Sequence, residues 1–330
     1  MKETTKQTVI PFGIGGLRPE DDDIDRRGFL DCMRWAGAGL IWTLQGGVPT
    51  SRLLGAPSPR KGISDDFCFV QISDSHIGFS KPANPDVNGT LQATVSKIQA
   101  MPQAPAMVLH TGDLTHLAKA AEFDTMEQIL KGLGQKQIFY VPGEHDMTGD
   151  DGKLYFERFG GHTTGNGWFS FDNKGVHFLG LNNVAQLEGM GRLGPDQLAW
   201  VKKDIASVAK STPVVVFAHI PLWTVYPEWN WGTQDSAELL SLLKSFGSLT
   251  VLNGHIHQNL QKVEGNVTFH TAMSTAFPQP KPGEAPAPGP MKVPSEHLRM
   301  LLGITEVRMV RGNSQLAVTD SPLDAMERQR

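Results

Sequence analysis

The 330-residue chain has little cysteine, little net charge and no long apolar run, and each shortage excludes a class of protein. Its two cysteines are too few for a disulfide scaffold. Because 30 Lys and Arg residues stand against 34 Asp and Glu, a net charge of −4, the chain lacks the basic field needed for general nucleic-acid binding. It has no run of about 20 apolar residues that would span a bilayer. Its 39% of hydrophobic residues is enough to build a large buried core.

Residues 1–64 differ from the rest of the chain. An acidic run at 20–25 precedes the paired Arg26 and Arg27, and a mildly apolar stretch follows at 35–48. An Arg pair followed by Phe-Leu and a weakly hydrophobic segment resembles a twin-arginine export signal. The resemblance implies export through the twin-arginine (Tat) translocase to the periplasm, with the leader either cleaved or retained as a membrane anchor. The alternative is an N-terminal amphipathic helix with an incidental Arg pair.

The remaining residues, 65–330, alternate short apolar runs with helical patterns. The patterns predict strands at 67–73, 106–110, 138–141, 168–172, 175–181, 214–217 and 249–252, and helices at about 89–101, 118–132, 195–210 and 235–246. The tail at 260–275 and 300–319 has the pattern of antiparallel strands. Strands separated by helices predict an α/β sandwich that is partly parallel inside and rich in hairpins toward its end.

Five consecutive predicted strands are each followed by carboxylate or imidazole side chains. In chain order these segments are Asp74-Ser75-His76, Gly112-Asp113, Gly143-Glu144-His145-Asp146, His219 and Gly254-His255-Ile256-His257. Ligands of such sheets lie just past the carboxyl ends of the strands. A single Asp-x-His or Gly-Asp is more often part of a turn. Five such segments at the same structural position favour one shared site.

The chemistry of these side chains favours a hydrolytic site with two metal ions. Imidazole nitrogens and carboxylate oxygens, without cysteine, suit Zn, Fe or Mn. Two ions about 3.5–4 Å apart hold a phosphoryl group, lower the pKa of bound water and stabilise the leaving oxygen. One carboxylate must then bridge the two ions.

These motifs, in this order, resemble those of the calcineurin-like metallophosphoesterases over about residues 72–257. The segments Leu-His-Thr-Gly-Asp-Leu-Thr at 109–115 and Val-Pro-Gly-Glu-His-Asp at 141–146 are most similar to the cyclic-nucleotide-phosphodiesterase-like branch. The resemblance implies a four-layered α/β/β/α metallophosphoesterase sandwich with mixed sheets over residues 65–330. It also implies hydrolysis of a small-molecule phosphate ester, either a phosphodiester or a phosphomonoester.

The resemblance assigns a role to each motif residue. It implies a first metal ion held by Asp74, His76, Asp113 and His257, and a second held by Asp113 as the bridge with Glu144, His219 and His255. It implies two divalent or trivalent ions, Fe, Mn or Zn, and a metal-bridging hydroxide as the attacking group. His145 would protonate the leaving alkoxide or contact the phosphate, and Asp146 would orient His145.

Glu144 departs from the family pattern, which has Asn at this position. Its negative charge should bind the second ion more tightly, reduce the Lewis acidity of that ion and repel a dianionic phosphate more than a monoanionic diester. Alternatively, Glu144 swings away and the second site is weak or empty. The alternative function is therefore a metal- or phosphate-binding protein of the same fold with little turnover. His116 is a second departure, where relatives often carry Asp, and we expect it beside the ligands or facing solvent.

Two loops are candidates for substrate contact. The stretch 221–231 follows a predicted ligand, and its Trp223, Tyr226 and Trp229 would stack a base or sugar or cover an apolar group, unless this is a packed surface loop. Residues 278–294 hold seven prolines, a composition typical of a flexible or polyproline-like linker, or here of a lid across the site mouth. The oligomeric state stays open at this point.

Overall fold

The computed structural model describes residues 39–45, 48–54, 67–134, 137–185, 187–309 and 315–324. The chain divides into two compact units, Met1–Ser58 and Pro59–Arg330. In the first unit, strands β1 (Gly39–Gln45) and β2 (Val48–Leu54) pair antiparallel. The Arg pair of the predicted leader lies outside the described residues. Within the described part of the chain, no helix combines the length and apolar character needed to cross a membrane.

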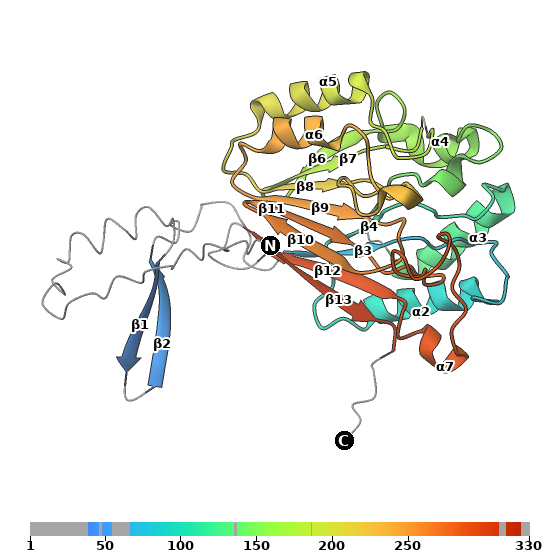
Figure 1. Ribbon diagram of the computed structural model, residues 1–330, viewed down its shortest axis with the longest axis horizontal. Coiled ribbons are helices and arrows are strands. Elements are labelled where there is room, and N and C mark those ends of the chain that lie inside the picture. The colour runs from blue at the N-terminus through green and yellow to red at the C-terminus, as the bar shows by residue number, and fades with distance from the viewer. Residues whose placement is uncertain are drawn as a thin grey trace, which may run out of the picture. The chain divides into compact units, whose positions relative to one another are not determined.

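The second unit contains two mixed β-sheets (Figure 1). The five-stranded sheet has the order β13 (Leu316–Pro322), β12 (Gly303–Met309), β3 (Cys68–Ile72), β4 (Met107–His110) and β5 (Gln137–Tyr140). The six-stranded sheet has the order β10 (Leu260–Glu264), β11 (Val267–Thr271), β9 (Leu249–Asn253), β8 (Val214–Phe217), β7 (Val176–Gly180) and β6 (Phe169–Asn173). Strands β3, β4 and β5 run parallel, as do β7, β8, β9 and β11, whereas the other neighbouring pairs are antiparallel.

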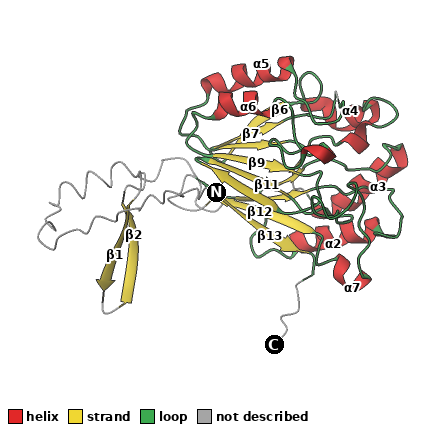
Figure 2. Cartoon of the chain, in the orientation of Figure 1, coloured by secondary structure: helices red, strands yellow, loops and turns green. Residues whose placement is uncertain are grey.

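Helices cover the outer face of each sheet (Figure 2). On the five-stranded sheet lie α2 (Val87–Gln99), α3 (Ala120–Leu130) and the short α4 (Lys153–Phe159), and on the six-stranded sheet lie α5 (Pro195–Asp204) and α6 (Ser236–Leu243). One further short helix, α7 (Ser295–Leu298), precedes β12. The predicted four-layered α/β/β/α architecture with mixed sheets is confirmed.

Alternating side chains of the central strands build the layers. In β3, Phe69 packs between the two sheets, whereas Val70 and Ile72 pack against the helices on the outer face. In β8, Phe217 likewise packs between the two sheets, and Val216 packs against the helices on the outer face. Full burial of such a side chain contributes about 1.5–3 kcal/mol relative to leaving it in water. Because both faces of these strands are buried, their sequences are continuous apolar runs, and the ends of the strands are held rigidly.

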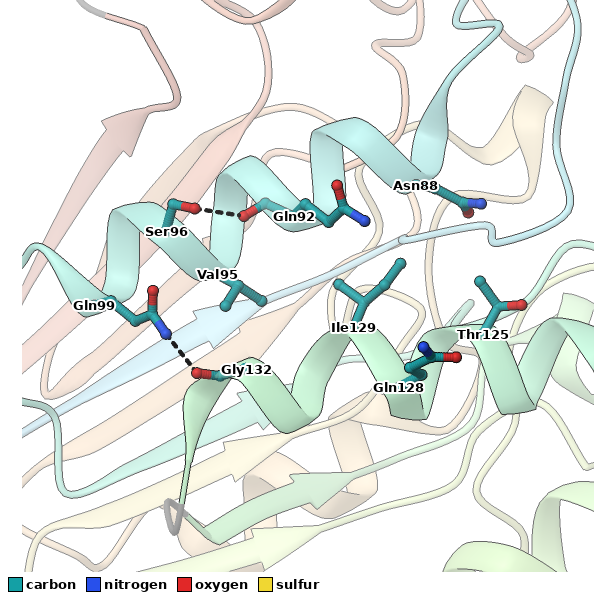
Figure 3. A pocket seen from close by; sticks show the side chains of 9 residues that line it. All are labelled: Asn88, Gln92, Val95, Ser96, Gln99, Thr125, Gln128, Ile129 and Gly132. Atoms are coloured by element: carbon teal, nitrogen blue, oxygen red, sulfur yellow. Dashed lines mark hydrogen bonds between the residues drawn. The ribbon is translucent and has the colours of Figure 1, made fainter.

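A groove of about 470 Å³ runs between α2 and α3 (Figure 3). Val95 and Ile129 face each other inside it, and neutral polar side chains such as Gln92 form its rim. The Gln99 amide donates a hydrogen bond to the Gly132 carbonyl and so joins the end of α2 to the segment that follows α3. None of the predicted site residues lines this groove, so it is separate from the site described next.

Candidate metal centre

The polar side chains that follow the parallel strands converge, as the sequence predicted. They come after β3, β4, β8 and β9, and after β5 from the 3₁₀ helix η2 (Glu144–Met147). Every one of the seven predicted ligands belongs to a group whose ligand atoms lie within 4.8 Å of one another: Asp74, His76, Asp113, Glu144, His219, His255 and His257. Two strand ends of one sheet and three of the other therefore contribute to one cluster.

The backbone at the strand ends is strained. Five ligands have a positive φ angle: Asp74 (54°), His76 (41°), Asp113 (52°), His255 (71°) and His257 (54°). Such left-handed conformations are uncommon for residues other than glycine and cost of order 1–3 kcal/mol each. Hydrogen bonds between neighbouring strand ends hold the conformation: the Asp74 N–H donates to Gly112 O at 3.0 Å, and the His76 N–H donates to Asp113 O at 2.9 Å. Strain of this kind concentrates at functional sites.

The first ligand group consists of Asp74, His76 and His257, each at most 3% exposed. His257 Nε2 lies 3.2 Å from Asp74 Oδ1 and 3.2 Å from His76 Nε2. Because His257 Nδ1 donates to the Phe277 carbonyl at 2.6 Å, its Nε2 is the nitrogen that carries a free lone pair. Burial tends to raise the pKa of Asp74, but the neighbouring His257 lowers it to about 2, so this carboxyl is ionised.

The second ligand group consists of Glu144, His219 and His255. Glu144 Oε2 lies 2.9 Å from His219 Nε2, and Oε1 lies 2.9 Å from His255 Nδ1. Burial would raise the pKa of Glu144, but His255 and His219 hold it well below its usual range. Glu144 therefore points into the cluster as an anion, and the alternative in which it swings away is not what the structure shows.

Three buried atoms of the second group, Nε2 of His219, Nδ1 of His255 and Oε2 of Glu144, belong to the close contacts just described but make no hydrogen bond of good geometry. Buried polar atoms are normally hydrogen-bonded, because leaving them without a partner is costly. Here all three face the same small space, and His219 Nδ1 is already committed, since it donates to the Thr111 carbonyl at 2.7 Å. These donors fit a metal ion that accepts imidazole nitrogen and carboxylate oxygen.

Asp113 lies between the two groups. Its Oδ2 is 3.5 Å from His76 Nε2 in the first group and 3.4 Å from His219 Nε2 in the second. Its other oxygen, Oδ1, accepts a hydrogen bond from the His145 N–H at 2.9 Å. A carboxylate held in this position, 2% exposed and in contact with both groups, fits the role of a bridging ligand.

His145 is held over the cluster by His116. Its Nδ1 donates to the His116 carbonyl at 2.8 Å, and the two rings stack with centroids 4.8 Å apart. Burial tends to lower the pKa of His145, but the Asp113 and Glu144 carboxylates outweigh burial and raise it. His116 thus lies beside the ligands, one of the two positions expected for it, and its contact with His145 is a role that sequence reasoning did not identify.

Asp146 does not contact the His145 ring, so the prediction that it orients this ring is wrong. Asp146 Oδ2 accepts hydrogen bonds from the Leu114 and Gly143 N–H groups, each at 3.0 Å. Its Oδ1 accepts from the N–H and the hydroxyl of Thr115 at 2.9 and 3.0 Å. Four donors therefore use both oxygens, and Asp146 instead ties the loop after β5 to the loop after β4.

The aromatic loop after His219 divides into a part that packs on the core and a part at the site. Trp223 is half-buried and packs on Phe269, with ring centroids 5.1 Å apart, against the core between the six-stranded sheet and its helices. Tyr226 packs edge-on against Trp229. Trp229 lines a cavity beside the metal ligands, together with Trp231, which was not predicted. Of the three predicted substrate contacts, only Trp229 reaches this cavity.

The proline-rich loop 278–294 forms a wall beside the site. Gln279 Nε2 donates to the His255 carbonyl at 2.9 Å, and Gln279 Oε1 accepts from the Gly289 N–H at 3.1 Å. Pro288 and Gly289 line the same cavity as Trp229. The hydrogen bonds anchor this loop beside a metal ligand, an arrangement that its linker-like composition did not reveal.

The model of the calcineurin-like phosphoesterase family matches residues 68–259, more than half of the chain. The chain belongs to this family, and it is a metallophosphoesterase, a hydrolase of phosphoric esters. A probable cyclic nucleotide phosphodiesterase from Vesicomyosocius okutanii is 23% identical over 219 residues, which cover 64% of this chain and 88% of that protein. A probable glycerophosphodiester phosphodiesterase from Arcobacter nitrofigilis is 23% identical over 222 residues, 62% of this chain and 77% of that protein.

Two solved structures share the fold. A dimetal phosphatase from Danio rerio superposes with a TM-score of 0.56 at 14% identity, covering 76% of this chain and 98% of that one. A purple acid phosphatase from yellow lupin superposes with a TM-score of 0.59 at 13% identity, covering 83% of this chain and 55% of that one. At this level of identity the likeness concerns the architecture alone.

Proposed function

We propose that this metallophosphoesterase hydrolyses phosphodiesters in preference to phosphomonoesters. The observation that carries the proposal is the Glu144 carboxylate, which points into a cluster that already holds Asp74 and Asp113. A phosphomonoester is largely a dianion at neutral pH, whereas a diester carries one charge, so a third carboxylate disfavours the monoester more. Two relatives, a probable cyclic nucleotide phosphodiesterase and a probable glycerophosphodiester phosphodiesterase, are also named as diesterases.

Two metal ions, Fe, Mn or Zn, would be held by the two ligand groups with Asp113 shared between them. When bound, such ions supply positive charge that polarises the phosphoryl group and activates water. The chain itself fixes the donors in place: the carbonyls of Thr111 and Phe277 hold the His219 and His257 rings with Nε2 toward the cluster. The positive charge for binding a phosphate ester thus comes from the ions, and the net acidity of the chain is no obstacle.

His145 would act as the general acid. Because Nδ1 donates to the His116 carbonyl, Nε2 is the nitrogen that can carry a proton toward a substrate. The neighbouring Asp113 and Glu144 carboxylates favour the protonated ring. This proton would pass from Nε2 to the leaving alkoxide oxygen.

Hydrolysis of bis(p-nitrophenyl) phosphate and of p-nitrophenyl phosphate, measured with Mn²⁺ added to the full-length protein, tests the proposal. We expect a higher kcat/KM for the diester, together with bound metal in the purified protein. A higher kcat/KM for the monoester would contradict the diester preference. Bound metal without turnover of either ester would instead favour the alternative, a binding protein of this fold.

We further propose that residues 1–64 are an export leader and that the Tat translocase delivers the folded domain to the periplasm. The order of Arg26, Arg27, Phe-Leu and a weakly apolar segment supports this proposal. The double substitution Arg26→Lys with Arg27→Lys should leave the protein in the cytoplasm of a fractionated bacterial host. Mutant protein in the periplasmic fraction would refute the assignment.

A further inference from the structure

A cavity of about 290 Å³ adjoins the second ligand group, and Glu144 and His255 form part of its wall. The rest of the wall includes residues of three separate segments: Leu187, the Trp229–Trp231 stretch, and Pro288 of the proline-rich loop. An apolar cavity of about 150 Å³ is enough to bind benzene. The space beside the metal ligands is therefore large enough for one ring system with substituents.

The wall of this cavity carries no Lys or Arg among the described residues that line it. Its charged or titratable groups are Glu144 and His255, and the rest of its surface is apolar or neutral. Leu187 is 39% exposed, so its side chain is open to a ligand, whereas Trp229 and Trp231 are mostly covered and form the base. A second phosphate or a carboxylate placed here would find no cation and would meet the Glu144 anion.

Asn230 supplies a polar contact within this apolar wall. Its left-handed backbone (φ 58°) ends the short helix η5 (Pro227–Trp229), and its side chain makes no hydrogen bond with another described residue. The amide of Gln279, by contrast, is committed to His255 and Gly289. An uncharged ligand that carries a hydroxyl, carbonyl or amide can hydrogen-bond to Asn230.

His145 does not line the cavity, although its ligand atom lies within 4.8 Å of those of Asp113 and Glu144. The cavity is lined by the second-group ligands Glu144 and His255, whereas the His145 ring packs against His116 and against His76 of the first group. A leaving oxygen protonated by His145 therefore lies at a ring that is outside the cavity wall. The ester group that stays on the phosphorus is the one that reaches the cavity, and a phosphomonoester has no such group.

From this arrangement we propose that the cavity is a subsite for the retained ester group of the diester, and that it accepts an uncharged, ring-bearing alcohol and rejects an anionic one. The inference rests on the proposed phosphodiesterase function and adds the substrate class. Leu187 is then a specificity-determining residue, because it is, with Pro288, an exposed apolar side chain of the wall.

The test uses three diesters with the same p-nitrophenolate leaving group and a different retained group: phenyl, methyl or 4-carboxyphenyl. With the Mn²⁺-loaded full-length protein, we expect kcat/KM for the phenyl ester to exceed that for the 4-carboxyphenyl ester by about tenfold or more. Leu187→Arg places a cation in the wall, so it should raise kcat/KM for the 4-carboxyphenyl ester about tenfold. The methyl ester carries no aryl group for this cavity, so Leu187→Arg should change its kcat/KM less than that of the 4-carboxyphenyl ester.

The matched control is Leu301→Arg, because Leu301 is 40% exposed and does not line the cavity. This control should leave all three rates within about twofold of the parent protein. Equal rates for the phenyl and 4-carboxyphenyl esters, or an equal effect of Leu187→Arg and Leu301→Arg, would overturn the inference while the diesterase function stands. Failure to hydrolyse any of the three esters, the methyl ester included, would instead contradict the proposed phosphodiesterase function on which the inference rests.

Discussion

The two ligand groups of this metallophosphoesterase differ in burial and in how closely they follow the family pattern. Asp74, His76 and His257 are at most 3% exposed. In the second group, the side chains of Glu144 and His255 are 26% and 15% exposed and border a cavity. The buried group is suited to holding an ion whatever the substrate, whereas the open group combines an extra charge with the space for a ligand. Substrate choice is therefore expected to depend on the second group.

The largest expected effect comes from the residue that the two groups share. Asp113→Ala removes a carboxylate in contact with His76 and His219. The binding of both ions should therefore weaken, and kcat/KM should fall at least about 10³-fold. Metal content by mass spectrometry and diester hydrolysis measure the two effects. The control His145→Ala should retain the metal while it loses activity on a diester with an alkyl leaving group, which needs protonation. Normal metal content in Asp113→Ala would show that this residue is no bridge.

Removal of metal by a chelator should distinguish the two ligand groups, because their side chains differ in exposure to solvent. Because Glu144 and His255 of the second group are partly exposed, although His219 is buried, and the first group is buried throughout, EDTA should remove one ion well before the other. Timed samples analysed for metal content and activity would show two phases, with activity lost in the first. Loss of both ions in a single phase would mean that the groups behave as one unit.

A smaller effect is expected from His116, which supports the general acid. His116→Ala removes the ring stacked on His145 and should lower kcat about tenfold for a diester with an alkyl leaving group, which needs protonation. The rate for bis(p-nitrophenyl) phosphate should change little, because p-nitrophenolate leaves without a proton. His116→Phe keeps a ring for stacking and should restore most of the loss. An equal loss on both substrates would point to damage of the metal site instead.

The sequence predicted the ligands because each one directly follows a strand that is buried on both faces. A strand of that kind is recognisable as an apolar run, and the sheet then brings its end to the site, as for Asp74 after β3 and His219 after β8. The short helix α4 was not predicted, because seven residues are too few for a clear helical period.

The contacts made by loop side chains were not predictable in this way. The partners of Asp146 include the backbone N–H groups of Leu114 and Gly143. Its sequence neighbour His145 was predicted as its partner, and that prediction is wrong. Trp223 and Trp229 belong to the same loop, yet only the packing of Phe269 decides that Trp223 turns to the core. Such choices depend on tertiary neighbours that a single sequence does not display.

The central claim is that the charge of Glu144 sets the diester preference, and Glu144→Asn tests it most directly. The measurement is the ratio of kcat/KM for bis(p-nitrophenyl) phosphate to that for p-nitrophenyl phosphate, with metal content determined on the same samples. We expect the ratio to fall about tenfold, through a rise in monoester hydrolysis, because the neutral amide no longer repels the dianion. An unchanged ratio in a variant that keeps both ions would contradict the account.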